Sequence, residues 1–134
     1  MSQKLFLVKF EVEDGVPIDE TSQRIKSTYI PDEFVDLLVE RKLSTEREIK
    51  ESAGVAPDIP VVFICDIERS IHEVDVKLAE CIKTAHEHVC GELLIDKEID
   101  NSYRDLLIWL KIREIFKLKL EKHIEDLQFM LVVG

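Results

Sequence analysis

Five residues between 72 and 90 carry the side chains that most often bind transition metals. They are His72, Cys81, His86, His88 and Cys90. On a helix, His86 and Cys90 share a face because they are four residues apart, so they could supply two zinc ligands. His72 would lie about 21 Å away along the same helix, too far for the same ion. The segment offers two ligands at most, and we expect Cys81 to fill core space and the histidines to flank it.

A second candidate lies where an apolar run ends. Asp66 follows residues 61–65, and Glu73 falls in the first turn of a helix predicted to begin at Ser70. Carboxylates at the end of a strand could hold Mg²⁺ for a metal-assisted enzyme, to which His72 could also contribute. The alternative is structural, with Glu73 completing a capping box with Ser70 and Asp66 ending the strand. We favour the structural interpretation.

No catalytic nucleophile is apparent in the sequence. No serine occupies a nucleophile elbow, and Cys65 lies within an apolar run, where a thiol is expected to be inert. No glycine-rich loop that could hold a phosphate accompanies the acidic residues. The catalytic residues therefore stay undefined, and the sequence favours a protein without enzymatic activity and without a cofactor.

Residues 43–55 resemble the first helix and turn of helix-turn-helix proteins. The resemblance implies a DNA-associated regulator that uses residues 32–60, with Gly54 making the tight turn. The pattern then departs from the family, because Pro57 and Pro60 interrupt the expected recognition helix and no basic residue occurs within it. We favour a plain helix pair that ends at Gly54.

The predicted last helix begins at Asp100 or Ser102 and ends near Asp126. Its core stripe follows helical spacing and consists of Trp109, Ile112, Phe116, Leu120, Ile124 and Leu127. Further apolar residues lie outside this stripe, namely Leu107, Ile108, Ile115 and Leu118. A helix that is apolar on two sides usually packs against two neighbours.

Another side of the same helix combines basic and aliphatic residues. Its members are Arg104, Ile108, Lys111, Ile115, Lys119 and Lys122. Between residues 104 and 123, six bases outnumber three acids, although the chain has a net charge of −10. A basic surface on an acidic protein attracts acidic partners, and another copy of the chain is the nearest one. We predict a homodimer that forms through this side, and the alternative is a solvated face.

Four stretches are predicted to be strands. Phe6, Val8 and Phe10 alternate within residues 4–13, and Leu5 and Leu7 make that stretch apolar on both faces. Asp14-Gly15 then favours a hairpin turn. The other predicted strands are residues 24–30, 61–65 and 129–133, with 19–23 as a loop and 61–65, an unbroken apolar run, at the centre of the sheet.

Four stretches are predicted to be helices. They begin at Pro31, at Ser44 or Thr45, at Ser70, and at Asp100 or Ser102. Gly54 and Gly91 are expected to end the second and third, and residues 92–96 fit either a strand or a turn. The predicted fold is α+β in a single domain over 1–134. A small mixed sheet of three to five strands packs against two long C-terminal helices and a short N-terminal helix pair.

Composition limits the remaining possibilities. The chain has 134 residues and no apolar run long enough to span a membrane or to form the core of a signal peptide, so a cytoplasmic location is expected. Its three cysteines predict reduced thiols. Scarce Asn and Gln beside abundant Glu and Lys are typical of thermophilic proteins. The net charge of −10 makes nucleic acid an unfavourable partner.

Overall fold

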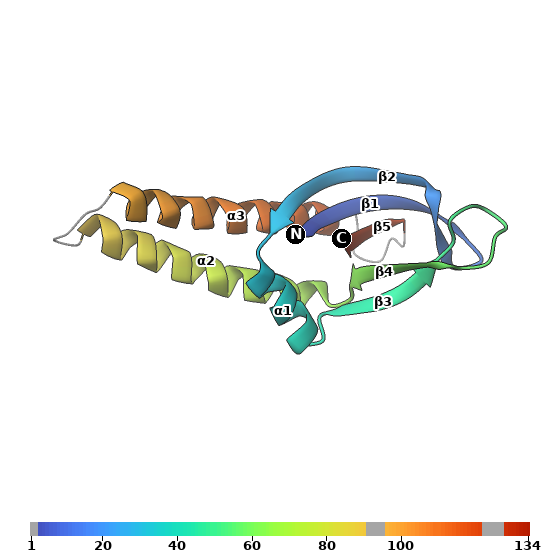
Figure 1. Ribbon diagram of the computed structural model, residues 1–134, viewed down its shortest axis with the longest axis horizontal. Coiled ribbons are helices and arrows are strands. Elements are labelled where there is room, and N and C mark those ends of the chain that lie inside the picture. Colours follow the sequence, from blue (N-terminus) through green and yellow to red (C-terminus); the bar gives the residue numbers. More distant parts are fainter. Residues whose placement is uncertain (1–2, 91–95, 122–127) are drawn as a thin grey trace.

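The structure is a computed structural model that describes residues 3–90, 96–121 and 128–134 (Figure 1). At residues 85, 88–90 and 96–102 it describes the backbone alone. Five strands and three helices follow one another within these ranges. In chain order they are β1 (Gln3–Glu13), β2 (Val16–Ile30), α1 (Asp32–Glu40), β3 (Ser44–Ile49), β4 (Ile59–Ile64), α2 (Ile67–Cys90), α3 (Asp96–Glu121) and β5 (Phe129–Val133).

The sheet has the strand order β2-β1-β5-β4-β3, and every neighbouring pair of strands is antiparallel. The α+β class is therefore confirmed, whereas the expectation of a mixed sheet is wrong. The strand predicted at 61–65 lies between two neighbours, but the middle of the sheet is occupied by β5, the apolar tail of the chain. This tail is a strand as predicted, and it joins β1 to β4.

The β1–β2 hairpin turns at Asp14-Gly15, as predicted. Both residues have positive φ angles, 51° and 78°, which suit a tight turn between twisted strands. β2 is longer than expected, because residues 19–23 belong to the strand and do not form a loop. The register between β1 and β2 shifts at two places, between Leu7 and Val8 and between Lys9 and Glu11, where β2 accommodates its extra residues.

The two edges of the sheet meet at one end. Ile18 of β2 forms a parallel bridge with Lys50, which follows β3. The Asp19 N–H donates to the Lys50 carbonyl at 2.8 Å, and the Lys50 N–H donates to the Pro17 carbonyl at 3.1 Å. The sheet is therefore curled into a partial barrel at this end, while the rest of β2 keeps a free edge.

The helix predicted from Ser44 or Thr45 to Gly54 is wrong, because residues 44–49 form β3 and pair with β4. The cause lies at the end of α1. Lys42 adopts a left-handed conformation, with a φ of 55°, and the Leu43 N–H donates to the Leu38 carbonyl at 2.8 Å. This Schellman-type ending sends the chain away as an extended strand. Three helices are therefore described where four were expected, and the helix-turn-helix over 32–60 is wrong for the same reason.

Helices α2 and α3 form an antiparallel hairpin that projects from one side of the sheet (Figure 1). α2 begins before Ser70 because Asp66 caps it, with the Arg69 N–H donating to Asp66 Oδ1 at 3.1 Å. α3 begins at Asp96, earlier than predicted, and is described to Glu121. The predicted end at Gly91, the stretch 92–95 and the predicted continuation to Asp126 lie outside the described residues. None of the described helices is long and apolar enough to cross a membrane.

Two apolar clusters lie on opposite faces of the sheet. The larger one joins the sheet to all three helices, and Phe34 of α1 sits at its centre with edge-to-face contacts to Trp109 and Phe116 of α3. The smaller one lies on the other face. Its buried members are Val8, Phe10, Ile49 and Phe63. Because β1 contributes to both clusters, the expectation that it is apolar on both faces is confirmed.

Candidate functional site

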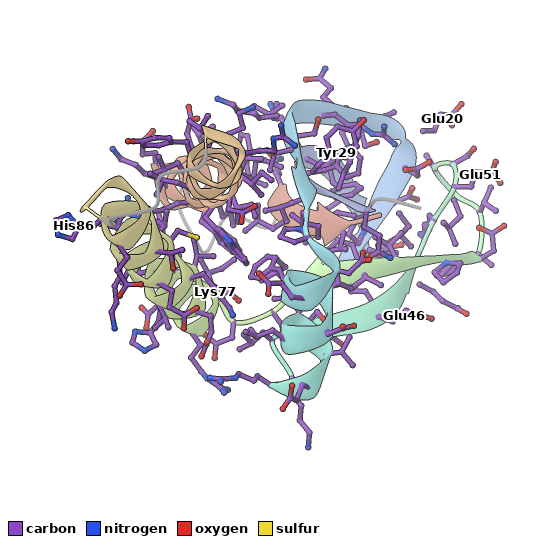
Figure 2. All side chains as sticks on the ribbon, turned by 60° about the vertical axis from the view of Figure 1, so that its left-hand side comes forward. Glu20, Tyr29, Glu46, Glu51, Lys77 and His86 are labelled. Atoms are coloured by element: carbon purple, nitrogen blue, oxygen red, sulfur yellow. The ribbon has the colours of Figure 1, made fainter. Side chains whose placement is uncertain are left out.

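The histidines and cysteines of α2 do not form a metal site in the part of the chain that is described. Cys81 is half-buried, His72 is exposed, and His86 is exposed on the side of α2 that points away from the sheet (Figure 2). The side chains of His88 and Cys90 are not among those described, so the pair His86 and Cys90 stays a prediction. Among the residues described, no three His, Cys, Asp or Glu side chains come together as metal ligands would.

Asp66 and Glu73 both have structural partners. Besides capping α2, Asp66 lies 3.9 Å from the Arg69 guanidinium and accepts, through its backbone carbonyl, a hydrogen bond from the buried Ser70 hydroxyl. Glu73 forms an ion pair with Arg41, which ties α2 to the end of α1. The predicted capping box between Ser70 and Glu73 is wrong, because Asp66 is the cap. Both carboxylates therefore fit the structural interpretation.

The two cysteines with described side chains differ in their environment. Cys65 is exposed, contrary to the expectation from its apolar run, since it follows the end of β4. Cys81 is half-buried, and burial, with a smaller contribution from the nearby Asp105 carboxylate, raises the pKa of its thiol. Lys77 acts to lower the pKa of the Cys81 thiol, but burial and the nearby carboxylates outweigh it, so Cys81 is not activated in the manner of a catalytic cysteine.

These environments predict unequal alkylation of the two thiols. At pH 8, iodoacetamide is expected to modify Cys65 at least about fivefold faster than Cys81, because Cys65 is exposed, whereas Cys81 is half-buried and its thiol has a raised pKa. Peptide mass spectrometry of timed samples would measure both rates. In urea the two rates should become equal, and a faster Cys81 in the folded protein would contradict the environments assigned to the two thiols.

The basic side predicted on α3 is divided between the core and the surface. Arg104 and Lys111 are exposed and Ile108 is half-buried, whereas Ile115 and Lys119 are buried inside the chain's own fold. The Lys119 ammonium donates to the Phe129 carbonyl, which holds this lysine against β5. Ile115 and Lys119 therefore cannot belong to an exposed interface. Lys122 lies outside the described residues.

The helix is rotated relative to the prediction. Trp109, Ile112 and Phe116 of the predicted core stripe are buried, but Leu120 is exposed. Ile115 and Lys119 take the place beside the sheet that Leu120 was expected to fill. The rotation leaves a different apolar surface in contact with solvent.

That surface lies on the projecting hairpin, and we call it the hairpin patch. Its members have side chains that are 46–58% exposed, and they are Ile82, Tyr103, Leu107 and Leu110. The three α3 members are spaced by four and three residues, so they form one helical stripe. The sequence signal for this patch was Leu107, an apolar residue outside the predicted core stripe.

Ile82 belongs to the same face of the hairpin as the α3 stripe. Asp75 of α2 and Arg113 of α3 form an ion pair of 2.8 Å across that face. Ile82 follows Asp75 by seven residues and Leu110 precedes Arg113 by three, spacings that keep each pair on one side of its helix. The hairpin patch is therefore continuous across both helices.

A second surface lies where α3 runs beside β2. It is a hollow of about 320 Å³ that we call the α3–β2 groove. Its lining residues are Lys4, Lys26, Ser27, Thr28, Tyr29, Lys111, Glu114 and Ile115. Two of them, Lys111 and Ile115, belong to the basic side predicted from the sequence. Figure 2 shows Tyr29 on β2, the strand at the edge of the sheet.

The charges in the α3–β2 groove are unequal. Glu114 is its one acidic residue, and its carboxylate lies 2.7 Å from the Lys26 ammonium, which lowers the pKa of Glu114. The Lys4 ammonium lies 4.5 Å above the centre of the Tyr29 ring. Among the described side chains Lys111 has no hydrogen-bond or ion-pair partner. The groove therefore keeps a positive surplus.

Comparison with known proteins adds no identification: no protein-family model, no curated protein and no solved structure matches this chain. Function is therefore inferred from the two surfaces of α3.

Proposed function

We propose that the protein is a binding or scaffold protein that self-associates as a dimer through the hairpin of α2 and α3. The observation that carries this proposal is the hairpin patch, four large apolar side chains that are about half exposed. All four belong to the hairpin of α2 and α3, which projects from the sheet (Figure 1). Single exposed apolar residues are ordinary, whereas a contiguous apolar patch is typical of an association site.

The geometry of a helical hairpin supports this interpretation. Two antiparallel helices bury only the seam between them, so apolar residues on a shared outer face need another element to cover them. Two hairpins that meet face to face form a four-helix bundle, in which each covers the patch of the other. A two-fold axis makes such a contact self-complementary.

Charge favours a second copy as the covering element. α2 carries five acids against three bases, whereas the exposed residues of α3 between 103 and 121 include four bases and three acids, since Lys119 is buried. In a four-helix bundle, α3 of one copy lies beside α2 of the other, and their opposite charges attract. The interface predicted from the basic side of α3 is thereby revised, with Arg104 and Lys111 at its border and the hairpin patch at its centre.

A substitution in the hairpin patch tests the proposal. Leu107→Asp removes an apolar contact and buries a carboxylate without a partner, so the dimer should weaken about a hundredfold. Light scattering would then report a monomer at a concentration where the unmodified protein is a dimer. Val39→Asp is the matched control, because Val39 is a 68% exposed helical residue of α1 outside the patch.

The outcome separates self-association from ordinary surface exposure. The proposal fails if Leu107→Asp leaves the mass unchanged, or if Val39→Asp dissociates the protein to the same extent. Far-UV circular dichroism of both variants would verify that the helices are retained.

A further inference from the structure

The outer edge of β2 is open beside the α3–β2 groove. Lys4 of β1 exchanges two backbone hydrogen bonds with Gly134, of 2.8 and 3.0 Å, so both its N–H and its C=O point toward β5. Lys4 stands opposite Tyr29 of β2. In an antiparallel ladder, a residue whose N–H and C=O both bond to one neighbouring strand forms no backbone hydrogen bond with the strand on its other side. Lys4 therefore does not bond to Tyr29, and the N–H and C=O of Tyr29 point away from β1. Because the backbone groups of successive residues alternate in direction along the strand, the N–H and C=O of Ser27 also point away from β1.

No strand in the described part of the chain covers this edge. β2 is the last strand on its side of the sheet, and its contact with the β3 edge is confined to residues 17–20. Apart from the ladder with β1, residues 24–30 form no backbone hydrogen bond with the described residues. The backbone groups of Ser27 and Tyr29 are therefore available to an added strand.

Lysines lie on both faces of the position that an added strand would occupy. Lys26 stands opposite Leu7, a member of the core cluster that faces the helices, so Lys26 lies on the helix side together with Lys111. Lys4 and Tyr29 lie on the opposite face, because side chains alternate along a strand. A strand added here meets positive charge on each of its faces.

We propose that the α3–β2 groove binds an extended acidic peptide segment of a partner protein, which adds to the free edge of β2. The backbone of the segment pairs with Ser27 and Tyr29, and its carboxylates meet Lys4 and Lys111. Charge complementarity favours an acidic occupant, since three lysines and a single, already paired glutamate line the groove of a chain with a net charge of −10. This proposal does not rest on the proposed dimer, although the groove shares Lys111 with the border of that interface.

A peptide fits the groove better than a nucleic acid does. The added strand uses the exposed backbone groups of β2, which a nucleic acid would leave without regular partners. The acidic remainder of the protein repels a long polyanion, whereas a short segment meets only the groove. The nucleic acid is therefore the competing outcome of the experiment.

The first experiment uses the unmodified protein and labelled peptides of about eight residues, long enough to cover the open edge. Fluorescence anisotropy at low salt compares a peptide of alternating Glu and Thr with its Lys–Thr counterpart. It also compares the Glu–Thr peptide with a form methylated on alternate backbone nitrogens, which cannot pair along one edge. The acidic peptide should bind at least about tenfold more tightly than either comparison peptide, and added salt should weaken its binding.

Two matched pairs of variants locate the site. Tyr29→Pro removes the outward N–H without breaking a bond to β1, so it should weaken binding about tenfold relative to Tyr29→Ala, which keeps the N–H. Lys111→Glu should weaken binding by a similar factor, whereas Lys83→Glu makes the same charge change on the exposed surface of α2 and should alter binding less than about twofold. Ile82→Asp should leave peptide binding unchanged, because Ile82 belongs to the hairpin patch and lies on α2, none of whose described residues lines the groove.

Several results would overturn the proposal. It fails if the acidic and basic peptides bind alike, if the methylated peptide binds as well as the unmodified one, or if the acidic peptide does not bind. It also fails if a labelled single-stranded oligonucleotide binds in the groove and the peptide does not. These comparisons use the unmodified protein, so they remain decisive even if a variant folds poorly.

Discussion

Replacing Phe34 with alanine is expected to lower the free energy of unfolding by about 3–5 kcal/mol. Phe34 is fully buried, and its ring makes edge-to-face contacts with Trp109 and Phe116, at 5.4 and 6.4 Å between ring centres. The substitution removes contacts that join α1 to α3 and leaves a cavity that rigid neighbours fill only in part. Urea unfolding followed by circular dichroism would measure the change.

The control for this prediction lies on the same helix. Val39→Ala shortens a largely exposed side chain of α1 and should change the free energy of unfolding by less than about 0.5 kcal/mol. A loss below about 1 kcal/mol for Phe34→Ala would mean that Phe34 does not join α1 to α3 in the core.

The second large effect is expected on the opposite face of the sheet. Ile49→Ala should cost about 2–5 kcal/mol, because Ile49 is fully buried in the smaller cluster with Phe10 and Phe63. Ile49 also ends β3 next to Lys50, whose bridge to Ile18 closes the curled end of the sheet. The loss should be visible in the same urea transition that reports Phe34→Ala.

Glu48→Ala supplies the comparison for Ile49, because Glu48 is an exposed residue of the same strand. Its effect should stay within about 0.5 kcal/mol. If Ile49→Ala proved equally mild, residues 44–49 would not form a strand that buries Ile49, and the fold would differ at that point.

Local signals account for the elements that were predicted correctly. The Asp14-Gly15 turn, the alternation in β1 and the apolar tail of β5 each act through neighbouring residues, and the structure confirms all three. The long helix that contains Val74 and Leu78 was also evident, because its apolar residues recur at helical spacing. Val74 and Leu78 are buried, whereas Ile82, the next residue at this spacing, is exposed. Its start was misplaced, since Ser70 competes with Asp66 as a capping residue in the sequence and only the structure selects Asp66.

β3 could not be predicted because its evidence is not local. Residues 44–49 contain a capping-box pattern and lack alternation, since Glu46, Arg47 and Glu48 are all exposed. Their strand conformation comes from pairing with β4 and from the left-handed turn at Lys42. Glycine usually occupies such a turn, so a lysine at this position did not indicate in the sequence that the helix ends there.

The interface predicted on α3 included Ile115 and Lys119, which the structure buries, because the helix is rotated relative to the prediction. Spacing along α3 shows which residues share a side, but it does not show which side faces the sheet. The burial of Lys119 could not be foreseen, because it depends on a hydrogen bond to the Phe129 carbonyl of a strand that follows in the sequence. Once Ile115 and Lys119 face inward, Leu107 and Leu110 must face outward.

α3 therefore serves three neighbours with three sides. One side packs Ile112 and Phe116 into the core, a second carries most of the hairpin patch, and a third lines the α3–β2 groove. This division explains why the helix is apolar on more than one side and locally basic in an acidic chain. The central proposal that rests on this division is self-association through the hairpin patch.

Sedimentation equilibrium of the unmodified protein at micromolar concentration tests that proposal most directly. The expected mass is twice the chain mass of 15.6 kDa, and it should fall toward one chain mass on dilution. A mass of 15.6 kDa at every concentration up to the millimolar range would contradict self-association and leave the hairpin patch without its proposed role.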